Sequence, residues 1–150
     1  MIWHYQTRIS TQLFGWSAFN VFGGAALLLL LANPFWQGVG LQSVVWGVID
    51  AGIAFFGQLG MRRKLARTPN PEDAELQLGE AQRLRRLLFI NAGLDLLYVA
   101  VGAGLLLTFG TESAFAQGNG VGIAVQGAFL LLFDLVHGWR TGKLVARTRA

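Results

Sequence analysis

The sequence predicts an all-α integral membrane four-helix bundle, and three observations lead to that prediction. Only 13% of the 150 residues are charged, about half of the roughly 25% found in an ordinary soluble domain. Four long runs are almost free of charge, and all 12 lysines and arginines lie outside them. We therefore expect one four-span membrane domain over residues 1–150, with the N and C termini in the cytoplasm.

Each of the four apolar runs is long enough to span a membrane as a helix. About 20 helical residues cross a hydrocarbon core of about 30 Å. The run 13–31 carries no charge, and the runs 41–60, 87–109 and 121–139 each carry one aspartate. Backbone groups in lipid must be satisfied within a segment or a closed barrel, so each run is predicted to be a helix. A soluble bundle is disfavoured because its helices would each show a charged outer face.

The first run is expected to be a retained span and not a cleaved signal peptide. Its start is weakly basic, with Arg8 alone, and Ser17 and Asn20 interrupt its apolar core. A signal peptide would need a basic start, an uninterrupted apolar core and a small-residue cleavage site.

The positions of the cations predict the orientation. Arg8 precedes the first span, seven cations lie in the loop 61–86, and four follow the last span, whereas the loops 32–40 and 110–120 contain none. By the positive-inside rule, both termini and the loop 61–86 are cytoplasmic. We expect a bacterial inner (plasma) membrane, with the cations near anionic headgroups and no role in binding nucleic acid. In this loop Asn70 is predicted to cap a helix that starts near Pro71.

The two halves of the chain resemble each other, which predicts two repeated helical hairpins with halves 1–70 and 71–150. Residues 64–68 (KLART) return as 144–148 (LVART), at an offset of 80, and residues 24–27 (GAAL) match 102–105 (GAGL) at an offset of 78. Apolar segments match easily by chance, so the similarity is moderate evidence. Any site shared by the halves would lie on an axis along the membrane normal.

Polar and small residues form one face on each predicted span. Ser17, Asn20 and Gly24 share a face, as do Gly47, Asp50, Ala54 and Gly57 on the second span. The corresponding residues on the third span are Asn91, Asp95, Tyr98 and Gly102, and on the fourth Gln126, Asp134 and His137. We expect these faces to meet inside the bundle, with the polar groups mostly in the cytoplasmic half. Eight glycines are expected to permit close helix approach: Gly23, Gly24, Gly47, Gly57, Gly93, Gly102, Gly104 and Gly127.

The candidate binding residues are the polar residues within these spans. Asp50, Asp95 and Asp134 have no lysine or arginine inside the spans to neutralise them, and an intramembrane acid marks a proton or cation site. Asn20, Asn91, Tyr98, Gln126 and His137 would support them. The alternative is that all of these side chains form interhelical hydrogen bonds that set helix register. Tryptophans near the span ends, Trp3 and Trp16 included, are expected in interfacial belts.

The sequence excludes several classes of function and leaves others open. It has no cysteine and none of the common motifs for catalysis, metal binding or phosphate binding, so we expect no enzyme, no metal and no cofactor. The leading hypothesis is a transporter-like protein that handles protons, a small cation or a small polar solute. The alternatives are an accessory subunit of a larger membrane complex, a homo-oligomer, and a binder of a lipophilic cofactor such as a quinone, carotenoid or haem. For haem, His4 is poorly placed to reach inward.

Overall fold

The structure, a computed structural model, describes residues 2–149, with side chains for residues 2–146. Four helices account for nearly all of it: α1 (Ile2–Leu30), α2 (Pro34–Ala66), α3 (Ala74–Phe109) and α4 (Ala114–Arg149). Each is long and apolar enough to cross a membrane. The prediction of an all-helical chain with four such helices is confirmed.

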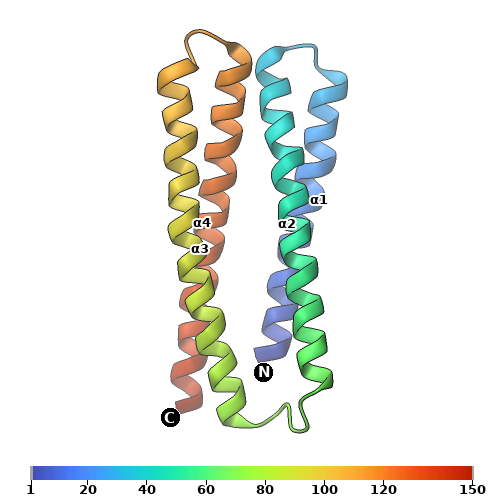
Figure 1. Ribbon diagram of the computed structural model, residues 1–150, viewed down its shortest axis with the longest axis vertical. Coiled ribbons are helices and arrows are strands. Elements are labelled where there is room, and N and C mark those ends of the chain that lie inside the picture. The colour runs from blue at the N-terminus through green and yellow to red at the C-terminus, as the bar shows by residue number, and fades with distance from the viewer. Residues whose placement is uncertain (1, 150) are drawn as a thin grey trace.

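The helices run alternately up and down (Figure 1). Both termini and the α2–α3 connection lie at one end, called the terminus end here, and the α1–α2 and α3–α4 connections lie at the other, the loop end. The cations therefore gather at the terminus end, although the side chains of Arg147 and Arg149 lie outside the described residues. This arrangement agrees with the predicted placing of both termini and the middle loop on one side.

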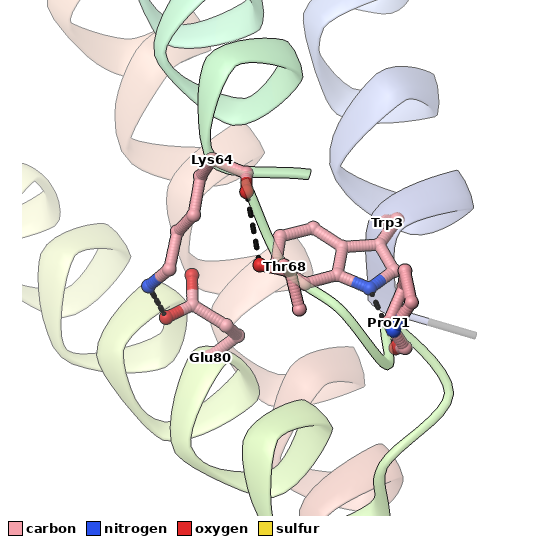
Figure 2. Close-up of polar contacts among 5 residues, drawn as sticks. All are labelled: Trp3, Lys64, Thr68, Pro71 and Glu80. Atoms are coloured by element: carbon pink, nitrogen blue, oxygen red, sulfur yellow. Dashed lines mark hydrogen bonds and ion pairs between the residues drawn. The ribbon is translucent and has the colours of Figure 1, made fainter. Parts of the chain in front are cut away.

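All four helices extend beyond the predicted spans at the terminus end. The stretch 61–86 is mostly helical, with only residues 67–73 between α2 and α3. The prediction that Asn70 caps α3 is wrong, because the Asp73 carboxylate accepts the N-terminal hydrogen bond from the Leu76 amide at 2.8 Å. The Pro71 carbonyl instead accepts a hydrogen bond of 3.0 Å from the Trp3 indole (Figure 2). This bond ties the connection to the start of α1.

Two antiparallel helix pairs, α1 with α2 and α3 with α4, are joined mainly through α2 and α4. Glycines permit close approaches within each pair: a Cβ added at Gly24 would lie 2.6 Å from the Gly40 carbonyl oxygen, and one at Gly102 would lie 2.7 Å from that of Gly120. Gly47 and Gly127 also lie at helix contacts, as expected. The expectation is wrong for four glycines, because a Cβ there would have no neighbour within 4 Å: Gly23, Gly57, Gly93 and Gly104.

The two hairpins use corresponding positions for these contacts. Gly24 meets Gly40 in the first hairpin, and Gly102 meets Gly120 in the second, at offsets of 78 and 80. Likewise Gly47 packs on the backbone of Ser17 and Val21, and Gly127 packs on the backbone of Asp95 and Val99. Both pairs of helices therefore cross in the same register.

Burial differs between the terminus end and the rest of the helices. The cluster of buried apolar side chains in the described residues, Ile2, Trp3, Ala81 and Val145, lies at the terminus end. Farther along, large apolar side chains such as Phe22 and Leu107 are 75% and 85% exposed. Trp3 is only 5% exposed, so its expected place in an interfacial belt is wrong. The helices are thus apolar on the outside over the stretches predicted as spans.

Candidate functional site

The polar residues predicted to face inward divide into buried and peripheral groups. Ser17, Asn20, Asp50, Asp95, Gln126, Asp134 and His137 are all buried. Asn91 is exposed, and Tyr98 is 37% exposed, because both lie on the side of α3 that faces the gap toward α2. Gly57 is exposed as well. The interior placement of the polar faces is therefore correct for most residues and wrong for these three.

The three acids line one pocket, which we call the acid pocket. It has a volume of about 140 Å³ and lies between α2, α3 and α4, with Leu13 of α1 at one side. Asp50 is 0% exposed, Asp95 is 5% exposed and Asp134 is 7% exposed. Among the described residues that line it, none is a lysine, arginine or histidine. The side chains of residues 2–146 form no group arranged to hold a metal ion.

The carboxyl oxygens of these acids have few partners. The Asp134 carboxyl lies near the Asp95 carboxyl and near the Asn91 amide. Both oxygens of Asp50 and the Oδ2 atom of Asp95 are buried without any hydrogen-bond partner. A buried ionised carboxylate that lacks a partner is strongly destabilised. The carboxyl oxygens in this pocket therefore require hydrogen-bond donors or positive charge that the surrounding side chains do not supply.

Aromatic side chains form much of the remaining wall of the acid pocket. Trp46 lies one turn before Asp50 on α2, Tyr98 lies one turn after Asp95 on α3, and Phe133 adjoins Asp134 on α4. The rings of Trp46 and Tyr98 meet edge to face, with centroids 4.7 Å apart. Both rings lie on the loop-end side of the acids, so this contact covers the pocket from that direction.

A larger pocket of about 390 Å³ lies next to the acid pocket on the terminus side, between α1, α2 and α3. On each of these helices its lining is about one turn from that of the acid pocket: Ile9 precedes Leu13, Gly57 follows Ile53, and Leu87 precedes Asn91. Lys64 and Glu80, which form an ion pair, line its outer part (Figure 2). We call this larger pocket the vestibule.

Asn20 and Gln126 lie outside the acid pocket, in a separate network between α1 and α4. The Gln126 amide donates to Asn20 Oδ1, and the Trp16 indole donates to Gln126 Oε1 at 3.1 Å. Trp16 also stacks on Phe129, with centroids 3.6 Å apart. Both the amide nitrogen and the amide oxygen of Gln126 have a hydrogen-bond partner within the protein. This is the pattern of a structural contact.

His137 likewise lies outside the acid pocket. Its Nδ1 atom is 2.9 Å from the Tyr5 hydroxyl, and its carbonyl accepts from Thr141 Oγ1 at 2.7 Å. Tyr5 is not among the predicted site residues, because it precedes the predicted first span. The apolar runs gave no signal for it, because α1 begins at Ile2, well before the first run. His4 is exposed.

The chain matches a family model that carries no assigned activity. Residues 12–135 match DUF6992, described as a family of unknown function. The matched range contains all three acids of the acid pocket. No curated protein and no solved structure matches the chain significantly.

Proposed function

The chain belongs to the DUF6992 family, whose function is unknown, and we propose that it is an integral membrane protein whose acid pocket binds protons or a small cation. The membrane location is supported by four sufficiently long apolar helices. It is also supported by the large apolar side chains exposed along them. The terminus end, where the cations gather, would face the cytoplasm, most simply of a bacterial inner membrane.

The binding function is supported above all by Asp50, which is fully buried, lines the pocket and has no hydrogen-bond partner on either carboxyl oxygen. Two further carboxyls, those of Asp95 and Asp134, share the pocket and lie near each other. Three neighbouring carboxylates without a cation would repel each other at low dielectric. Either protons or a bound cation must therefore balance them.

A duplicated hairpin is the second part of the proposal. It is supported by the matching glycine contacts of the two hairpins and by the moderate sequence similarity at offsets of 78 and 80. The acids do not follow this repeat: by the same offsets, Asp50 corresponds to Leu130, Asp95 to Ser17 and Asp134 to Ala54. The acid pocket therefore does not follow the proposed repeat, because its three acids have no acidic counterparts in the other half.

The binding proposal is tested by removing each charge while keeping the shape of the side chain. We expect Asp50→Asn, Asp95→Asn and Asp134→Asn each to lower proton flux at least about tenfold, because each change removes one of the carboxyl groups proposed to hold the proton. The flux is measured in proteoliposomes loaded with a pH-sensitive dye, under an imposed membrane potential. Glu112→Gln, in the exposed α3–α4 connection, is the matched control and should leave the flux unchanged.

Two outcomes of this experiment contradict the proposal. One is an equal flux in the wild type and all three aspartate variants. The other is a wild type that neither conducts protons nor releases them when Na⁺, K⁺ or an organic cation is added. The remaining reading would then be that the acids serve helix packing alone.

A further inference from the structure

The acid pocket is small, which limits the ligands that fit it. Its volume of about 140 Å³ is close to the roughly 150 Å³ of an engineered protein cavity that admits benzene. It is well below the about 300–1,000 Å³ of sites for drug-sized ligands. A ligand of about six non-hydrogen atoms or fewer therefore fits, and nucleotides and sugars do not.

The wall chemistry selects among small ligands. The carboxyl groups supply negative charge, and Trp46, Tyr98 and Phe133 supply aromatic surface in the same pocket. A hard inorganic cation gains most from a shell of oxygen ligands. An alkylammonium ion instead gains from ring faces, which attract its positive charge, together with a carboxylate as counter-ion. Three aromatic rings beside three acids favour the second kind of ligand.

From this combination we propose that the acid pocket takes a small alkylammonium cation in exchange for a proton. The inference rests on the proposed function and names its ligand class. In the empty pocket a proton neutralises a carboxyl; when the cation binds, that O–H bond breaks, the carboxylate keeps the electron pair, and the proton leaves to water. Total charge is conserved, since one cation enters as one proton departs. No bond within the ligand is made or broken.

The surroundings indicate the direction from which the ligand arrives. The edge contact between Trp46 and Tyr98 covers the pocket toward the loop end. Beyond it, glycine-mediated backbone contacts bring α2 and α4 together at Gly38 and Gly118. The vestibule adjoins the opposite side within about one helical turn. The exchange therefore takes place with the solution at the terminus end.

Tetramethylammonium is a suitable probe, because it has five non-hydrogen atoms and a fixed charge. Binding to the full-length protein in nanodiscs is followed by calorimetry in buffers of different ionisation enthalpy, which counts the protons released. We expect tetramethylammonium to bind at least about tenfold more tightly than K⁺, with about one proton released per cation. The neutral alcohol tert-butanol, of similar size, should bind without proton release.

Aromatic variants separate this inference from the proposed function. Trp46→Leu and Tyr98→Leu should each weaken tetramethylammonium binding about tenfold, as expected for a desolvated cation–π contact. Trp36→Leu is the matched control, because this tryptophan lies outside the pocket near the loop end. Asp50→Asn should abolish the proton release.

The outcomes are distinguishable. Aspartate-dependent proton flux or K⁺ binding with no preference for tetramethylammonium, or with no effect of Trp46→Leu and Tyr98→Leu, overturns the ligand class and leaves the proposed function intact. Equal affinity for tert-butanol and tetramethylammonium also overturns it, because the charge would then be irrelevant. Absence of cation binding, proton release and proton flux overturns both proposals.

Discussion

Individual polar side chains in this protein serve two different purposes. Asn20, Gln126 and Trp16 are joined by side-chain hydrogen bonds between α1 and α4. Neither carboxyl oxygen of Asp50 has a hydrogen-bond partner. A buried polar group is stable when its hydrogen bonds are complete and destabilising when they are not. The complete network is therefore expected to hold the two helices in register, and the incomplete set is expected to bind a ligand.

The structural role of the network gives a prediction for Gln126→Leu. This change leaves Trp16 Nε1 and Asn20 Oδ1 without their partner, so the free energy of unfolding should fall by about 1–2 kcal/mol. Asn20→Leu should have a similar effect, and the double variant should lose less than the sum of the two. Reversible unfolding of the protein in bicelles measures all three.

Thr108→Ala is the control for these variants, because the exposed Thr108 hydroxyl bonds only the Gly104 carbonyl of its own helix. It should change the free energy of unfolding by less than about 0.5 kcal/mol. Strictly additive losses in the Asn20 and Gln126 variants would show that the two side chains act independently.

At the level of helices, packing depends on whether a glycine faces a backbone or open space. Gly23 and Gly24 are neighbours in sequence, yet only Gly24 faces α2. A Cβ at Gly24 would lie 2.8 Å from Ser43 Cβ and 2.9 Å from the Val44 amide nitrogen, so α1 and α2 would have to separate. The contact is between backbones, which cannot turn aside as a flexible side chain can.

These positions give a matched pair of predictions. Gly24→Ala should lower the free energy of unfolding by about 1–3 kcal/mol, the usual effect of overpacking. Gly23→Ala should leave it unchanged or raise it slightly, because alanine is the better helix former and nothing is in its way. Thermal unfolding of the two variants in the same detergent measures the difference. Equal stability would contradict the close contact between α1 and α2.

The helices and their inner faces were largely predictable from sequence, because charge-free length and helical spacing depend on local residues alone. The stripe of Ser17, Asn20 and Gly24 is an example. The far ends of the helices were not predictable in this way, since charged residues end an apolar run without ending a helix. The exposure of Asn91 and Tyr98 was also missed, because it depends on how far α2 stands from α3, a property of the assembled helices.

The whole molecule shows two packing regimes along its length. Buried apolar side chains cluster at the terminus end, where water would drive their burial. Along the apolar stretches, the buried residues are mainly glycines and polar side chains, and large apolar side chains are outside. Lipid removes the hydrophobic drive between helices, so small residues and hydrogen bonds take its place. The boundary between these regimes therefore indicates where the membrane surface would lie.

The membrane location and its orientation are tested together by cysteine labelling, which has no background because the chain contains no cysteine. Asn70→Cys is in the α2–α3 connection, Glu112→Cys is in the α3–α4 connection, and Phe22→Cys is 75% exposed on α1. In intact bacterial cells a membrane-impermeant maleimide should label only Glu112→Cys, and in inverted vesicles only Asn70→Cys.

Phe22→Cys should stay unlabelled in both preparations, because lipid would cover this position, which the rest of the protein leaves largely uncovered. It should react once the protein is unfolded in detergent. Efficient labelling of Phe22→Cys in membranes would contradict the span over 13–31, since a water-facing position reacts readily. Labelling of Asn70→Cys and Glu112→Cys from the same side would contradict the helix topology across a bilayer. A reversed pattern would keep the four spans and place the terminus end, with its vestibule, outside the cell.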